Sequence, residues 1–301
     1  MTFKDYLIFF RWKNILMILL IQCLFKYVLF QKFYLQISLD YFHFTLLAIS
    51  ISAVAIAGYI INDINDVKAD IINKPEKLFV DKKLTRITAQ NLFIGFNAVG
   101  LIIGMYLSYH IGHTSYFIIF VFTSLLLYKY AKILKKKILA GNLMVSFIVL
   151  FCILMLAVFD IAPATNGYNL EDQLVIIRIF LLFGGFGFFF TFLREVIKDF
   201  EDSEGDKAIN AKSFPIVLGE NKTKIILYVL STVMVFALVF ICYEVFHENI
   251  YLSLYLLGLV LLPLLYFIWK LSKASSKKDY HDLSAMLKII MLFGILSMLS
   301  I

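Results

Sequence analysis

Apolar residues run along the chain in nine long stretches, which shorter polar segments separate. The stretches fall at about residues 15–31, 42–61, 91–109, 115–131, 138–159, 174–193, 225–245, 250–269 and 284–301. An α-helix needs about 20 apolar residues to cross the hydrocarbon core of a bilayer. The strands of a membrane barrel would instead alternate apolar and polar residues over about 10 positions. The pattern therefore predicts an all-α, polytopic membrane helix bundle with about nine transmembrane helices.

The composition excludes a soluble or disordered chain. Hydrophobic residues make up 61% of the 301 residues and charged residues 16%, whereas soluble domains average about 45–50% and 25%. Cys23, Cys152 and Cys242 each lie within an apolar stretch, which indicates buried thiols rather than disulfides or metal ligands. We expect residues 1–301 to form a single membrane domain.

Lysine and arginine gather in alternate connecting segments. The segments 1–14, 62–90, 129–137, 194–224 and 270–281 hold 24 of the 28 basic residues. By the positive-inside rule, we expect an integral protein of the inner cell membrane with its N-terminus and these five segments cytoplasmic and its C-terminus outside. This topology accounts for the net charge of +7, so nucleic acid is not an expected partner.

Two of the basic segments begin with acidic clusters at the end of an apolar stretch. The first cluster holds Asn62, Asp66 and Asp70, spaced i, i+4, i+8. The second holds Asp199, Asp202 and Asp206, spaced i, i+3, i+7. Each spacing predicts one shared helix face, on which like charges repel each other unless a cation offsets them. Oxygen ligands without nearby His or Cys favour Mg²⁺ or Mn²⁺, and Mg²⁺ fills its remaining positions with water and substrate phosphate. We therefore expect the two clusters to face each other and to hold a diphosphate through metal ions in a cytoplasm-facing active-site cavity.

Four stretches resemble signatures of the UbiA superfamily of intramembrane prenyltransferases. Residues 62–70 (Asn-Asp-x-x-Asp-x-x-x-Asp) resemble its first motif, and residues 199–206 (Asp-x-x-Asp-x-x-x-Asp) resemble its second. Tyr128-x-x-x-Lys132 with Gly141-Asn142, and residues 212–219, resemble its connecting segments. The resemblance covers almost the whole chain. In residues 58–63 and 194–206 the chain is most similar to the geranylgeranylglyceryl phosphate geranylgeranyltransferase branch.

This resemblance implies Mg²⁺-dependent transfer of a prenyl group, geranylgeranyl in that branch, from a prenyl diphosphate to an acceptor. The acceptor is a glycerol-phosphate lipid or, alternatively, an aromatic ring. The implied catalytic residues are Asp66, Asp70, Asp202 and Asp206, which with Asn62 and Asp199 are also the implied metal ligands. The implied diphosphate contacts are Tyr128, Lys132, Arg194, Lys198 and Lys77. At Lys77 the family commonly has arginine, and lysine lacks its bidentate fork.

Other interpretations depend on where charged and aromatic residues lie. A cation-coupled transporter would carry carboxylates near mid-span, but the interiors of the apolar stretches hold only Lys26, Arg178 and Lys288. Soluble prenyl diphosphate synthases also carry aspartate-rich pairs, yet the hydropathy excludes them. Tyr59 and the aromatic run 188–192 lie near the acidic clusters, where ring faces can stabilise an allylic cation. The oligomeric state stays open.

Overall fold

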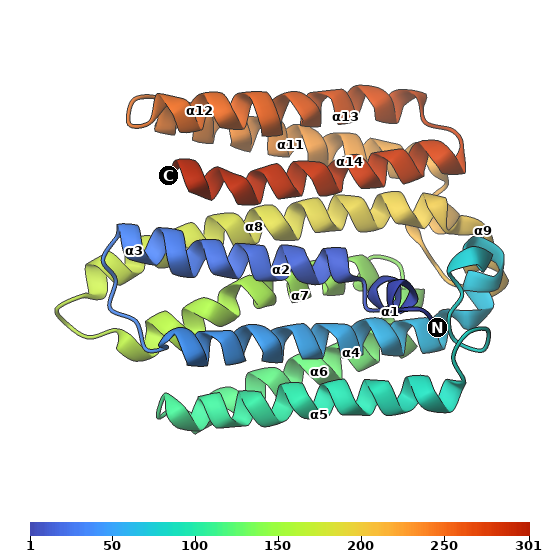
Figure 1. Ribbon diagram of the computed structural model, residues 1–301. Helices are drawn as coiled ribbons and strands as arrows, with labels where there is room; N and C mark the ends of the chain where they lie inside the picture. The colour runs from blue at the N-terminus through green and yellow to red at the C-terminus, as the bar shows by residue number, and fades with distance from the viewer. The chain divides into compact units, whose positions relative to one another are not determined.

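A computed structural model describes residues 1–301, with Lys77 described by its backbone alone. The chain forms two compact units (Figure 1). Unit 1 comprises residues 1–135 and 150–184, and unit 2 comprises residues 136–149 and 185–301. The long helices α7 (Ala140–Leu156) and α8 (Leu170–Glu201) each contribute one part to each unit.

Nine helical segments among the described residues are long and apolar enough to cross a membrane, which confirms the number expected. They cover residues 12–32, 41–73, 86–110, 114–132, 140–164, 170–201, 220–246, 250–273 and 277–300. The chain is therefore an integral, all-helical membrane protein. Several helices extend beyond the apolar stretches: the extension of the second span carries the first acidic motif, and that of the sixth carries Asp199, the first residue of the second motif.

Unit 1 contains the short helix α1 (Phe3–Phe9) and the first four spans. The first span is α2 (Trp12–Leu24), which passes through the π-helical turn Phe25–Leu29 into α3 (Phe30–Lys32). It is followed by α4 (Tyr41–Asn73), α5 (Arg86–His110) and α6 (Phe117–Lys132). The end of α7 continues through a second π-helical turn, Ala157–Ile161, before the start of α8.

Helices α4 and α5 run side by side in unit 1 (Figure 1). Their close approach depends on Gly100, because a Cβ there would lie 2.6 Å from Cγ2 of Val54. The hydroxyl of Ser50 donates a 2.7 Å hydrogen bond to the Gly100 carbonyl across the same contact. Small residues with hydroxyl–carbonyl bonds of this kind bring membrane helices together. This packing fixes α4, which carries the first acidic motif.

A second part of the unit 1 core lies around the C-terminal half of α4. Phe9 from α1 packs there with Ile60, Ile61 and Ile64 of α4 and with Phe79 from the following loop. The ring centroids of Phe9 and Phe79 are 5.6 Å apart. Helix α1 is thereby anchored beside the motif. Helix α4 ends at Asn73, two residues before Pro75, since proline disfavours helical backbone before it.

Unit 2 is built around the second half of α8 and the last three spans. These spans are α11 (Glu220–Phe246), the pair α12 (Ile250–Leu256) and α13 (Leu262–Lys273), and α14 (Lys277–Leu296). A π-helical turn, Leu257–Leu261, joins α12 to α13. The short helices α9 (Ser203–Ala208) and α10 (Phe214–Leu218) connect α8 to α11. Helix α8 buries Leu193, Val196, Ile197 and Phe200, a helical spacing that turns one face into the core.

Candidate active site

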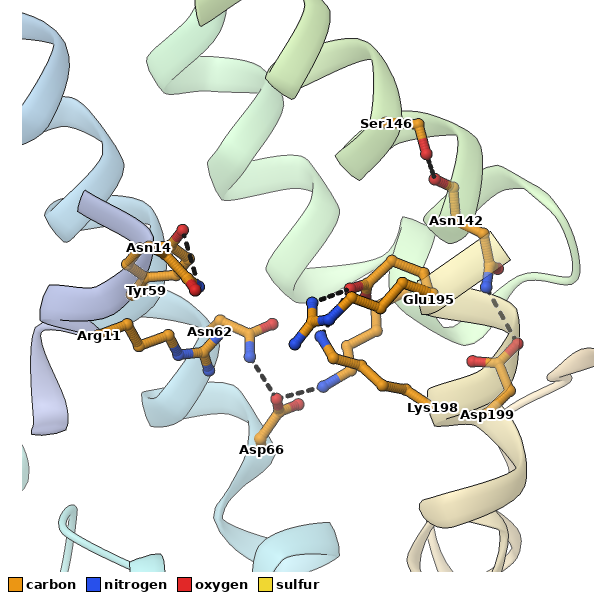
Figure 2. Close-up of polar contacts among 12 residues, drawn as sticks. Arg11, Asn14, Tyr59, Asn62, Asp66, Asn142, Ser146, Glu195, Lys198 and Asp199 are labelled. Carbon is orange, nitrogen blue, oxygen red and sulfur yellow. Dashed lines mark hydrogen bonds and ion pairs between the residues drawn. The ribbon is translucent and has the colours of Figure 1, made fainter. Parts of the chain in front are cut away.

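The first motif lies on the last turns of α4 in unit 1. Asn62 and Asp66 are buried, with 6% and 5% of their surfaces exposed, and Asp70 one turn later is half-buried. The amide Nδ2 of Asn62 donates a 2.5 Å hydrogen bond to Oδ2 of Asp66 (Figure 2). The shared helix face that the i, i+4 spacing predicts is present at these two residues.

The same carboxylate forms an ion pair with a residue that the sequence did not single out. Lys135, in the short 3₁₀ turn after α6, places its ammonium on Oδ2 of Asp66. Burial acts to lower the pKa of Lys135, but Asp66, together with Tyr130 and Asp70, outweighs it, so the net pKa lies above its ordinary value. Lys135 is therefore charged and compensates Asp66. Residues 129–137 hold five lysines, and nothing in their local pattern distinguishes Lys135.

A second missed residue, Arg11, approaches α4 from the N-terminal segment. Its Nη2 donates to Oδ1 of Asp63 at 2.7 Å, and its guanidinium lies 4.7 Å from the ring centroid of Tyr59. Asn14 Nδ2 also donates to the Tyr59 hydroxyl at 3.3 Å (Figure 2). Arg11 has a φ of 52°, in the left-handed region. Such strain in a non-glycine residue marks positions that their surroundings hold in place.

This contact changes the interpretation of the aromatic residues near the motifs. One face of Tyr59 already holds the Arg11 guanidinium. In the run 188–192, Phe190 and Phe192 are buried in the unit 2 core, and Phe188 packs edge-on against Phe147 with centroids 4.9 Å apart. These rings have packing partners that account for them without a bound substrate.

Tyr128 and Lys132 lie one turn apart at the end of α6, as their spacing predicts. The ammonium of Lys132 donates to the Tyr128 hydroxyl and lies 4.4 Å from the centroid of its ring. Lys132 is exposed and Tyr128 half-buried. The tyrosine thus orients the lysine, which stays accessible to an anion. The predicted contact of Lys77 lies outside the described side chains.

In unit 2, the second motif begins with Asp199 near the end of α8. Its Oδ2 accepts a 3.0 Å hydrogen bond from Nδ2 of Asn142, a buried residue of α7. The hydroxyl of Ser146 donates to the Asn142 carbonyl at 2.7 Å (Figure 2). Asn142 belongs to the Gly-Asn pair found in the sequence, and here it holds a motif carboxylate through a neutral amide.

The continuous helix expected for the second motif is interrupted at one residue. Helix α8 ends at Glu201 and α9 begins at Ser203, with Asp202 between them at φ −99° and ψ 5°. Backbone bonds still cross the break: Asp202 N–H donates to the Lys198 carbonyl at 2.8 Å, and Asp206 N–H donates to the Asp202 carbonyl at 3.0 Å. Helical backbone hydrogen bonds therefore continue across the break, although α8 and α9 are separate helices.

Arg194 and Lys198, the two basic residues predicted beside the second motif, both contact Glu195. Oε1 of Glu195 lies 2.6 Å from Lys198 Nζ (Figure 2). The same oxygen lies 3.3 Å from Arg194 Nη1. The buried Nε of Arg194 has no hydrogen-bond partner among the described atoms. One carboxylate thus holds two cations at the end of α8, and the guanidinium retains a donor that a further acceptor could use.

The donor set of the first motif fits a magnesium ion. No three His, Cys, Asp or Glu side chains of the described residues gather closely enough to hold a metal by themselves. Mg²⁺ does not require this, because it takes one or two carboxylates and completes its shell with water and phosphate. Oδ1 of Asn62 is buried and accepts no hydrogen bond among the described atoms, which is rare for a buried carbonyl oxygen. Beside the Asp66 carboxylate, this oxygen would be a hard ligand for such an ion.

Comparison with known proteins places the chain in a family. A model of the UbiA prenyltransferase family matches residues 19–291. The digeranylgeranylglyceryl phosphate synthase of Methanobrevibacter smithii is 36% identical over 174 residues, which is 56% of this chain and only 56% of that protein. The synthase of Sulfurisphaera tokodaii is 30% identical over 244 residues, 81% of this chain and 82% of that protein.

Solved structures share the fold. A structure described for digeranylgeranylglyceryl phosphate synthase in membranes has a TM-score of 0.62 at 23% identity and covers 99% of both chains. A UbiA homolog from Archaeoglobus fulgidus bound to GPP and Mg²⁺ has a TM-score of 0.60 at 15% identity and covers 98% of this chain and 99% of that one. From the match over residues 19–291 and the relative aligned over most of the sequence, the chain belongs to the UbiA prenyltransferase family.

Proposed function

We propose that the protein is a Mg²⁺-dependent membrane enzyme that transfers a geranylgeranyl group from geranylgeranyl diphosphate to a glycerol-phosphate prenyl ether lipid. The family supports the reaction class, and the names of the relatives support the acceptor. The observation that carries the proposal is the buried Asn62–Asp66 pair, with its unsatisfied amide oxygen at the end of a membrane-spanning helix.

In this proposal both acidic motifs serve one diphosphate. The metal ligands are Asn62, Asp66, Asp70, Asp199, Asp202 and Asp206, with catalytic importance for Asp66, Asp70, Asp202 and Asp206. When bound, Mg²⁺ stabilises the negative charge that builds on the diphosphate as its bond to the prenyl group breaks. Asn142 and Tyr128 act as positioning residues, because the first holds Asp199 and the second orients Lys132.

The basic residues of the site would bind the diphosphate oxygens. Lys132 is exposed and held over Tyr128. Arg194 and Lys198 are gathered by Glu195, so their side chains are already ordered before an anion arrives. Pre-ordering long side chains reduces the entropy lost on binding. We also propose that Lys77 contacts the diphosphate, and this proposal is based only on the position of Lys77 in the segment that follows the first motif.

The distribution of basic residues supports a membrane orientation. Five segments hold 24 of the 28 Lys and Arg residues, and both acidic motifs lie in such segments. We propose that these segments and the N-terminus are cytoplasmic and that the C-terminus is outside. The family match crosses both compact units, which supports one functional membrane domain over residues 1–301.

An acceptor screen tests the proposed reaction. Purified protein is incubated with Mg²⁺, geranylgeranyl diphosphate and either geranylgeranylglyceryl phosphate or a hydroxybenzoate, and products are identified by mass spectrometry. We expect transfer to the glycerol-phosphate lipid and its loss in Asp66→Asn and Asp202→Asn. Asp172→Asn, at an exposed acid in the first turn of α8, is the matched control. Transfer to the hydroxybenzoate alone would show that the acceptor is an aromatic ring and not the glycerol-phosphate lipid. Transfer to neither acceptor would overturn the proposed function.

A further inference from the structure

The two side chains that contact Asp66 do so on the same oxygen. Oδ2 accepts from the amide of Asn62 and from the ammonium of Lys135. Asp66 is buried, with 5% of its surface exposed, so its charge requires a partner inside the protein. Lys135 supplies that partner. A cation therefore already lies on the carboxylate that the proposed function assigns to a metal ion.

A divalent ion and an ammonium repel each other strongly when both lie against one buried carboxylate. Two like charges about 4 Å apart interact far more strongly in a protein interior than in water. Binding of a metal ion to Asp66 therefore favours movement of Lys135 away from the carboxylate. The lysine is suited to this movement, because about a third of its side chain (32%) is exposed and its ammonium is carried on a flexible stem.

Three carboxylates near the motifs, Asp63, Asp199 and Glu195, are compensated differently. Asp63 pairs with Arg11, but it is not one of the proposed metal ligands. In unit 2, Asp199 accepts from the neutral amide of Asn142, while Glu195 holds the neighbouring basic residues. Lys135 thus differs from these side chains, because its charge lies directly on a proposed metal ligand.

We propose that Lys135 is a displaceable counter-ion, which holds Asp66 in the metal-free protein and turns to the diphosphate when a metal ion takes the carboxylate. This inference rests on the proposed function. A metal ion held by Asp66 would bind the diphosphate beside this carboxylate, where the Lys135 ammonium already lies and where it could bind a phosphate oxygen. The exchange makes the binding of the metal ion and of the diphosphate cooperative. The metal ion alone has to displace the Lys135 ammonium, whereas the diphosphate gives that ammonium a new partner.

The test measures metal binding without catalysis. Mn²⁺ affinity is determined by electron paramagnetic resonance on purified protein without diphosphate. We expect Lys135→Met to bind Mn²⁺ about tenfold more tightly than wild type, because a charge-assisted hydrogen bond no longer competes. Lys135→Arg keeps the charge and should bind Mn²⁺ like wild type. Lys137→Met, at an exposed lysine two residues further along, is the matched control.

A second measurement follows the diphosphate. With saturating Mg²⁺, Lys135→Met should bind the unreactive thiolodiphosphate analogue of geranylgeranyl diphosphate about tenfold more weakly than wild type, because one ammonium contact is lost. If Lys135→Met does not fold, Lys135→Gln replaces it, since the glutamine amide can still donate to Asp66.

The outcomes separate the two proposals. Unchanged or weaker Mn²⁺ binding in the neutral variants, together with loss of Mn²⁺ binding in Asp66→Asn, would overturn the counter-ion role and leave the proposed function intact. Mn²⁺ binding that Asp66→Asn does not alter would instead overturn the metal site on which the proposed function depends. Tighter Mn²⁺ binding with weaker analogue binding supports the exchange.

Discussion

Lys26 Nζ lies 2.6 Å from Oδ2 of Asp160, although 134 residues separate the two in the chain. Both side chains are buried, with 2% and 0% exposed. Each lies in a π-helical turn, Phe25–Leu29 in the first span and Ala157–Ile161 in the fifth. The pair also holds the loop before α4, because Lys26 donates to the Leu39 carbonyl and the Leu39 N–H donates to Asp160. The lysine that interrupts the first apolar stretch thus has a defined structural partner.

Replacing Lys26 by methionine should destabilise unit 1 strongly. Removing one partner of a buried ion pair leaves the other charge uncompensated, at a cost of about 3–5 kcal/mol. Thermal unfolding in detergent, followed by intrinsic fluorescence, measures the change. The double variant Lys26→Met/Asp160→Leu removes both charges and should recover a large part of the loss. A Lys26→Met protein as stable as wild type would show that the pair does not hold the fold together.

Arg11 affects stability in two ways, through its side-chain contacts and through its left-handed backbone, and two substitutions separate these effects. Arg11→Ala and Arg11→Gly both remove the guanidinium from Asp63 and Tyr59. Glycine adopts the left-handed conformation without the cost of a Cβ, so Arg11→Gly should be about 1 kcal/mol more stable than Arg11→Ala in the folded state. Chemical unfolding of the two variants measures this difference. Equal stabilities would show that the segment relaxes out of the left-handed conformation once the arginine is gone.

The spans could be predicted from the sequence because hydropathy is a local property, legible in about 20 consecutive residues. The Asn62–Asp66 contact was predictable for the same reason, since its two residues lie one helical turn apart. Contacts between residues far apart in the chain leave no local pattern in the sequence from which they could be predicted. Lys135 reaches Asp66 across 69 positions, and only the fold distinguishes it from the four other lysines of its segment.

The break at Asp202 was missed for a related reason. The spacing of the second motif is that of one helix, and the interruption changes the backbone at a single residue without altering that spacing. Asp202 and Ser203 are residue types that favour N-caps and turns, and Asp202 is the N-cap of α9, but the regular spacing of the motif favours a single helix. The structure was therefore needed to place Asp202 between two helices.

The anchoring of α1 should be insensitive to pH in the physiological range. Asp5 completes the capping box of α1, whose N-cap is Thr2, and it accepts a 2.8 Å hydrogen bond from Lys83. The hydrogen bond from Lys83 is the largest of the effects that lower the pKa of Asp5, from 3.8 to about 2. A lowered folded-state pKa gives a stabilising contribution that is complete above the unfolded value and disappears as the pH falls through the folded one.

Hydrogen exchange of the α1 amides tests this in Asp5→Asn against wild type. The variant should exchange faster, by the same factor at pH 5 and at pH 8 after correction for intrinsic rates, and the two proteins should converge as the pH falls from about 4 towards 2. A difference that changes between pH 5 and pH 8 would point to another titrating group.

Asn142 should be needed to position Asp199 for the proposed reaction. Asn142→Ala removes the amide that donates to the carboxylate, and a buried acceptor that loses its donor costs about 1–3 kcal/mol. We expect kcat/KM for geranylgeranyl diphosphate to fall about tenfold, since 1.4 kcal/mol corresponds to that factor. Ser146→Ala, which removes only the hydroxyl bonded to the Asn142 carbonyl, is the matched control and should have a smaller effect. If Asn142→Ala and Ser146→Ala reduce activity equally, the amide contact with Asp199 is not what positions the carboxylate.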